Sequence, residues 1–318
     1  MTDLINLEKM MNSDLKSKMG KKEKIIIPKP PSDYFGGVTL DVKSVHTAIA
    51  NLSSVEVPIL IKCVSSLYGF IAKDRTGNAL IVDELGGIGK LAELICHADV
   101  QVRRYSLMTL ALAAHLTAVS RQLIRNRRHL LPRLVKLCQQ DDDQVAVEFA
   151  SRILAELSKF TRIRDDLADH CQIVPGLFRY QDPDVKKHTL TVLINLATDF
   201  TLVDVITDYA DLIVPYCLKN LQSQFQIIQQ LSMELLHVLC HEQDAFDHFV
   251  ECDGTNQILT YLLNVDFAPL HQYALKILTH VWCNNTQAFI DNGSMEKVAT
   301  SILARIGQCT HFRSFDYF

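Results

Sequence analysis

Six segments of the chain repeat one spacing of small and apolar residues. In each segment a small residue is followed four positions later by an aliphatic residue and three positions after that by another apolar residue. Residues at these offsets lie on one face of an α-helix, so each segment predicts a helix with one buried face. The triplets are Cys63-Leu67-Phe70, Ser106-Leu110-Ala113, Ala150-Leu154-Leu157, Thr189-Leu193-Leu196, Ser232-Leu236-Leu239 and Ala274-Leu278-Val281.

The triplets recur at a nearly constant interval. Their central residues are separated by 43, 44, 39, 43 and 42 positions, which is typical of helical repeat arrays. In such an array each repeat buries its apolar face against its neighbours, and the small residue lets the next helix approach closely. The pattern therefore predicts an all-α solenoid with long helices near residues 56–72, 100–116, 144–159, 184–198, 226–241 and 268–283.

A second motif recurs at the same period, ahead of most of the long helices. Pro132, Pro175 and Pro215 each follow an apolar pair and lie 43 and 40 positions apart, and in an earlier copy Gly87 and Gly89 take their place. Proline is favoured in the first turn of a helix, where its missing N–H has no partner in any case. We therefore expect a second helix to open near each of these positions. The apolar stretches 79–85 and 202–209 predict a further short helix in their repeats.

Units of three helices resemble the armadillo repeat family, and residues 83–94 and 184–197 are especially similar to its consensus. The resemblance covers about residues 38–306 and implies a right-handed superhelix of about six repeats. HEAT repeats share the period but have two helices each, and the extra short helices favour armadillo repeats. On either side of the array, 37–307, we expect a flexible, mildly basic tail over 1–36 and an aromatic tail over 308–318.

Composition and charge narrow the class of protein. The 318 residues are 48% hydrophobic and carry a net charge of −4, so no global field attracts nucleic acid or an anionic membrane. No run of 18 apolar residues occurs, so no membrane span is expected. The nine cysteines form no C-x-x-C pair and fit buried thiols in a reducing compartment. We expect a cytoplasmic protein; association with the cytoskeleton or a cilium, and a nuclear location, stay open.

The glycine-rich segment that contains Gly87 and Gly89 has the spacing of a dinucleotide-binding loop. Such a loop must directly follow a strand, whereas Asp83-Glu84-Leu85-Gly86 intervenes here after an apolar run, and no parallel-sheet pattern surrounds it. Lys90 is followed by leucine rather than serine or threonine, which excludes a P-loop. We interpret the glycines as structural.

A set of histidines and cysteines is the one candidate metal site. His237, Cys240 and His241 have helical spacing, and imidazole and thiolate are the ligands that zinc prefers. Cys240 follows the core residue Leu239, however, and no familiar spacing supplies a fourth ligand, so a packed cysteine between surface histidines is the favoured interpretation. We expect no catalytic residue, cofactor or metal; an enzyme that depends on a nucleotide or on zinc is the least favoured alternative.

The resemblance implies a concave groove, lined by the long helices, along which a partner lies as an extended peptide. The groove positions flank the central leucine of each triplet by two residues, with one further position a turn earlier. The residues expected to bind a partner are Arg104, Met108, Leu112, Glu148, Arg152, Glu156, Lys187, Thr191, Asn195, Gln230, Glu234, Lys276 and His280.

The identities at these positions narrow the kind of partner. Nuclear import receptors of the importin-alpha kind place tryptophan and asparagine there, whereas this chain has Asn195 and no tryptophan, which disfavours binding of nuclear localisation signals. A basic stripe like that of beta-catenin is only partly present. The favoured function is a non-enzymatic scaffold or adaptor that binds a peptide or helix of a protein partner, without nucleic acid or membrane. A structural subunit of a cytoskeletal or axonemal assembly is the alternative.

Overall fold

The computed structural model describes residues 42–140, 143–171, 173–264 and 268–285. The chain divides into two compact units, Met1–Val38 and Thr39–Phe318, and all described residues belong to the second. Within these residues every regular element is a helix, which confirms the predicted all-α solenoid. Both expected tails, 1–36 and 308–318, lie outside the described residues.

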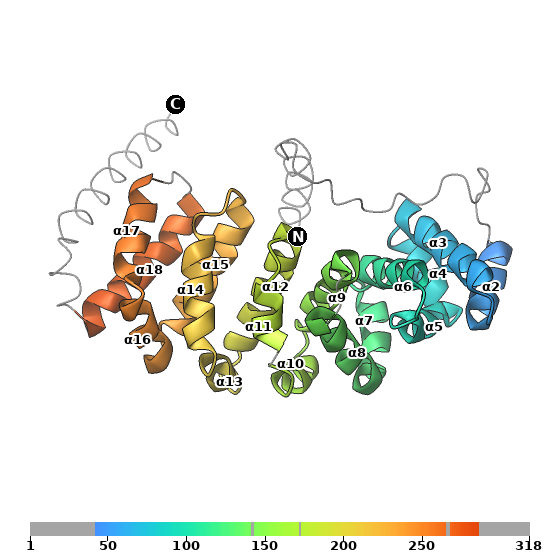
Figure 1. Cartoon of the computed structure of the whole chain (residues 1–318), viewed down its shortest axis with the longest axis horizontal. Helices are drawn as coiled ribbons and strands as arrows, with labels where there is room; N and C mark the ends of the chain where they lie inside the picture. Colours follow the sequence, from blue (N-terminus) through green and yellow to red (C-terminus); the bar gives the residue numbers. More distant parts are fainter. Residues whose placement is uncertain (1–41, 141–142, 172, 265–267, 286–318) are drawn as a thin grey trace, which may run out of the picture. The chain divides into compact units, whose positions relative to one another are not determined.

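The helices fall into groups of three, in the order short helix, middle helix, long third helix (Figure 1). The first group consists of α2 (Val42–Ala50), the 3-10 turn η1 (Asn51–Ser53) and α3 (Val57–Lys73). The next groups are α4 (Gly77–Glu84), α5 (Gly87–Leu94) and α6 (Val100–Ala113); α7 (Thr117–Arg125), α8 (Arg127–Gln140) and α9 (Gln144–Leu157); and α10 (Thr161–Ala168), α11 (Ile173–Phe178) and α12 (Pro183–Ala197). The last groups are α13 (Val203–Thr207), α14 (Ala210–Asn220) and α15 (Gln226–Leu239), and α16 (Gln243–Glu251), α17 (Gly254–Asn264) and α18 (Ala268–Asn284). Three helices per unit are the armadillo arrangement.

Consecutive third helices pack directly on one another. Helix α3 contacts α6, and the series continues through α9, α12 and α15 to α18. We call this series the ladder. The six third helices begin and end within three residues of the long helices that the triplets predict. The middle helices pack behind the ladder, since α5, α8, α14 and α17 each contact the third helix of their own repeat.

The triplet residues form the core of the ladder. All eighteen are buried, and the six central residues are at most 3% exposed. Where the small residue is threonine, its hydroxyl is satisfied within the helix, because Thr189 Oγ1 donates to the carbonyl of Val185 at 2.7 Å. Where the small residue is serine, at Ser106 and Ser232, the hydroxyl is buried and has no hydrogen-bond partner among the described residues, so close approach there carries a polar cost.

Aspartates fix the start of three third helices. Asp99 accepts hydrogen bonds from two backbone amides at the start of α6, and Asp182 does the same for α12. Asp143 accepts from the amide of Val145 at the start of α9. An aspartate at this position satisfies amides that have no partner inside the helix. Its negative charge also interacts favourably with the positive end of the helix dipole.

The proline prediction is wrong for two of the three middle helices. Pro175 lies in the first turn of α11, but Pro132 and Pro215 lie inside α8 and α14, which begin several residues earlier. A proline inside a helix removes one backbone hydrogen bond. In α8 the preceding Leu130 and Leu131 are both buried, so the apolar contacts of the earlier turn favour helix despite the lost bond.

The turn between α4 and α5 explains the glycine-rich segment. Gly86 has φ +74°, which L side chains rarely adopt, and it directly precedes α5. A Cβ on Gly87 would lie 2.7 Å from Cγ1 of Val82, so this position excludes a side chain. Since a helix rather than a strand precedes the turn, the segment is not a dinucleotide-binding loop, and the structural interpretation stands.

Replacement of Leu193 by alanine should lower the free energy of unfolding by about 2–5 kcal/mol, because it leaves a cavity where α12 contacts α9 and α15. Urea unfolding followed by far-UV circular dichroism measures this. Leu212→Ala is the matched control: Leu212 is 40% exposed on α14, so its truncation should cost about 0.5 kcal/mol or less. Equal losses in the two variants would contradict the ladder as the core.

Candidate functional site

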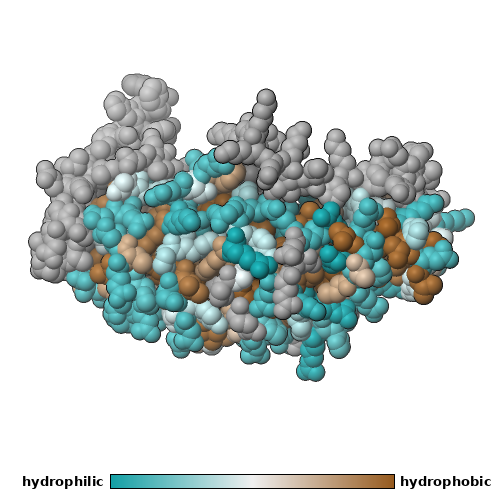
Figure 2. Space-filling model, in the orientation of Figure 1, coloured by the Kyte–Doolittle hydropathy of each residue, from teal (hydrophilic) through white to brown (hydrophobic). Residues whose placement is uncertain are grey.

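Most of the expected partner-binding residues lie partly exposed on one face of the ladder. We call the following set, all partly or fully exposed, the ladder face: Arg104, Glu148, Arg152, Glu156, Lys187, Thr191, Asn195, Gln230, Glu234, Lys276 and His280. On the side of the molecule that Figure 2 shows, hydrophobic residues appear as separate patches among hydrophilic ones. Charges and hydrogen bonds, rather than one apolar patch, therefore characterise the candidate surface.

Two expected residues are not available to a partner. Met108 is 0% exposed and Leu112 is 6% exposed. The reason is the composition of α6, in which every residue from Tyr105 to Ala113 is buried. A helix that is apolar on all sides is enclosed on all sides, and α6 is flanked by both α3 and α9. The prediction that Met108 and Leu112 contact a partner is therefore wrong, because both side chains lie in the core.

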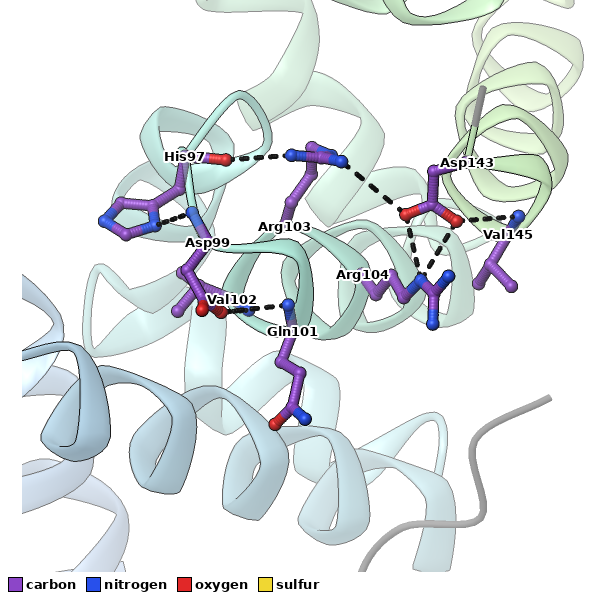
Figure 3. A network of polar contacts seen from close by, with 8 residues as sticks. All are labelled: His97, Asp99, Gln101, Val102, Arg103, Arg104, Asp143 and Val145. Carbon is purple, nitrogen blue, oxygen red and sulfur yellow. Dashed lines mark hydrogen bonds and ion pairs between the residues drawn. The ribbon is translucent and has the colours of Figure 1, made fainter. Parts of the chain in front are cut away.

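Arg104 links two repeats. Its Nε lies 2.9 Å from both carboxylate oxygens of Asp143, the residue that caps α9 (Figure 3). Arg103 joins the same carboxylate at 3.7 Å and donates to the backbone carbonyl of His97 at 3.1 Å. The Asp143 side chain is only 7% exposed, and charge-assisted bonds of this kind are among the stronger ones. Arg104 thus holds α6 against α9, a role that the sequence did not indicate.

Other polar residues of the ladder face are also engaged within the fold. The amide of Asn195 donates to Ser158 Oγ at 2.8 Å, and Thr191 Oγ1 donates to the carbonyl of Lys187 at 2.9 Å. Glu156 accepts from Lys159 at 2.6 Å. In the importin-alpha pattern the asparagine holds the peptide backbone, whereas here its amide joins α12 to the end of α9.

Arg152 on α9 and Lys187 on α12 are the accessible cations in the middle of the face. Neither forms an ion pair with another described residue. The carboxylate nearest to them, Glu148, has its pKa raised to about 8, chiefly by burial and then by the charges of Asp184 and Asp182. Glu148 is therefore largely protonated at neutral pH, and the middle of the ladder face carries a positive charge.

A hollow of about 550 Å³ opens between α15 and α18. His237 of α15 and His241, just after the end of that helix, line one side, and Lys276 and His280 of α18 line the other. The imidazoles touch in a row: the His241 ring centroid lies 4.6 Å from that of His280 and 5.3 Å from that of His237. The sequence placed Lys276 and His280 on this face but considered His237 and His241 only as metal ligands. His237 and His241 follow Glu234 by three and seven residues, and this helical spacing could have placed them on the same face as Glu234.

His237, Cys240 and His241, the candidate metal ligands, do not share an accessible site. Cys240 is 2% exposed, and burial raises the pKa of its thiol to about 12. Across the part of the chain that the structure describes, no group of three or more His, Cys, Asp or Glu side chains is placed to hold a metal ion. Cys240 is thus a packed core residue, as the favoured interpretation expected.

One serine and one histidine approach each other, but in the core. Ser151 Oγ lies 3.5 Å from Nδ1 of His188 and donates to the backbone carbonyl of Glu148 at 2.8 Å. Ser151 and His188 are both buried, and burial holds the pKa of His188 well below its ordinary value. A nucleophile must reach its substrate, so this contact is structural.

None of the described helices has the length and apolar character that crossing a membrane requires.

Comparisons with known proteins agree with the fold. No family model matches the chain. It is 29% identical to human armadillo repeat-containing protein 3 over 174 residues, which is 54% of this chain and 20% of that protein, so the match spans about a fifth of the relative's length. A designed armadillo repeat protein is 16% identical with a TM-score of 0.64 and covers 74% of this chain and 99% of its own. Another, solved in complex with the peptide (KR)4, is 16% identical with a TM-score of 0.61 and covers 74% and 98%. The resemblance to armadillo repeat proteins is confirmed.

Replacement of Asp143 by alanine should lower the free energy of unfolding by about 1–3 kcal/mol, because it removes both a helix cap and the carboxylate that binds Arg103 and Arg104. Asp99→Ala is the control, since Asp99 caps α6 with two backbone hydrogen bonds and should lose only about 1 kcal/mol. Urea unfolding compares them. A loss at Asp143 no greater than that at Asp99 would show that the link between repeats adds no stability.

Replacement of Glu148 by glutamine should stabilise the fold at about pH 8 and leave it nearly unchanged at about pH 4.5. The folded pKa is raised to about 8, so the stability that protonated Glu148 contributes is present at low pH and is lost as the pH rises through that value. Urea unfolding at both pH values tests this. Glu93→Gln, at an exposed site on α5, should change neither; a pH-independent effect at Glu148 would contradict the raised pKa.

Proposed function

We propose that the chain is a non-enzymatic protein-binding scaffold, and that the ladder face from α9 to α18 binds an extended or helical segment of a protein partner. The observation that carries this proposal is the uninterrupted series of third helices, which presents Arg152, Lys187 and Lys276 on one face without ion-pair partners among the described residues. Such a surface offers recognition without reactive groups.

The spacing of the ladder suits an extended peptide. Packed helices lie about 8–10 Å apart, and an extended chain advances about 3.3 Å per residue. A bound peptide therefore places about two to three residues over each repeat. About seven to nine residues would pass from α9 to α18.

The designed armadillo protein solved with a basic peptide supports this use of the fold. The (KR)4 peptide is a ligand of that designed protein only, because at 16% identity the two chains share the fold and nothing more specific. For this chain we propose an adaptor that works in the cytoplasm with a protein partner and needs neither cofactor nor metal.

Reversal of charge in Arg152→Glu together with Lys187→Glu should weaken partner binding at least tenfold while leaving the fold intact, because both side chains lie on the ladder face and away from its core. Quantitative mass spectrometry after affinity capture identifies proteins retained by the native chain and lost from the variant. Isothermal titration with a purified retained protein then measures the affinity.

The matched control is Arg162→Glu with Lys219→Glu, which reverses two exposed charges on α10 and α14, away from the ladder. It should bind as the native chain does. Equal binding by both double variants would remove the ladder face as the site. Loss of binding only on deletion of residues 1–36 or 308–318 would instead favour a structural subunit that assembles through its tails.

A further inference from the structure

The hollow between α15 and α18 concentrates hydrogen-bond donors at one end of the ladder face. Neutral imidazole carries one N–H donor, and that of His280 is engaged with the backbone carbonyl of Cys240. His237 and His241 each bring one further N–H, Lys276 adds an ammonium group, and Gln272 adds an amide. Among the described residues that line the hollow there is no aspartate or glutamate.

Contacts within the fold hold the imidazoles in place. The His280 ring packs edge-on against His241 at 4.6 Å and against Phe246 of α16 at 5.5 Å. His237 packs against Tyr273 at 5.7 Å. Nδ1 of His237 is buried and has no hydrogen-bond partner among the described residues. A buried polar atom of this kind is costly unless a ligand or water satisfies it.

Burial, together with neighbouring cationic groups, favours the neutral form of two of the three imidazoles, His237 and His280. Burial, followed by the charges of His241, Lys276 and His280, lowers the pKa of His237. Burial and the charge of His241 lower the pKa of His280. Glu234, on the same face of α15, accepts a hydrogen bond from Tyr273, and burial raises its pKa. From α16 the contact is the uncharged Phe246.

We propose that this hollow binds the carboxylate of an acidic side chain of the protein partner, and that binding is coupled to uptake of a proton by the imidazoles. The inference rests on the proposed function and specifies its partner. Lys276 supplies the permanent charge and the imidazoles supply directed donors. A bound carboxylate favours the charged form of a neighbouring imidazole, so the hollow gains a second positive charge only when it is occupied.

The coupling has a defined sign. Because the pKa values of His237 and His280 are lowered in the free protein and a bound carboxylate raises them, affinity increases as the pH falls toward 6. Uptake of one proton sets an upper limit of about tenfold in affinity per pH unit. A basic ligand would behave in the opposite way, since protonated imidazoles repel it.

The test uses the full chain with three peptides of equal length: octaglutamate, octaglutamine and (KR)4. Isothermal titration at about pH 6 and about pH 7.5, in buffers of different ionisation enthalpy, measures affinity and protons taken up. Octaglutamate should bind more tightly than the other two peptides, several-fold more tightly at the lower pH, and with net proton uptake. Weaker binding than (KR)4, or no detectable octaglutamate binding at about pH 6, would overturn the inference.

Variants locate the effect. His237→Gln with His280→Gln should abolish the pH dependence and weaken octaglutamate binding at about pH 6, whereas His129→Gln, at an exposed site on α8, should change neither. Urea unfolding confirms that each variant is folded. Unchanged pH-dependent binding by the double variant would remove the hollow as the site, while the Arg152 and Lys187 capture experiment would still decide the proposed function separately.

Discussion

Close contact between consecutive third helices is the constraint on which the rest of the structure depends. A small residue in each triplet lets the helices approach, and a leucine three or four residues away fills the space between them, so all eighteen triplet residues are buried. A single repeat has no partner for this face and cannot bury it alone. The repeats are therefore mutually dependent, and the order of the third helices in space follows their order in the chain.

The same packing decides which residues remain for a partner. Where a third helix is apolar on all sides, as α6 is, it contributes to the core and leaves little surface for recognition. From α9 onward the outer positions are polar, and some of these residues, such as Asn195, serve contacts between repeats. Among the residues left over, Arg152, Lys187 and Lys276 give the ladder face its positive character. Stability and recognition thus use different residues of the same helices.

Sequence periodicity predicted the third helices to within three residues, because burial of one helical face imposes a pattern that a single chain displays. It failed for Pro132 and Pro215, where buried apolar residues just before the proline extend the helix several residues ahead of the predicted start. It also missed the bond between Arg104 and Asp143, 39 residues apart, and the row formed by His237, His241 and His280. Contacts between side chains of different repeats depend on relative helix positions, and the spacing of residues in the sequence does not contain that information.

Native-state hydrogen exchange of the free chain, followed by mass spectrometry, tests the central claim most directly, because amide protection reports the local free energy of opening. If the ladder is the stabilising element, amides of α9, α12 and α15 exchange more slowly than those of the short helices α10, α13 and α16 in the same repeats. Equal or slower exchange in the short helices would contradict the claim that the third helices hold the array together.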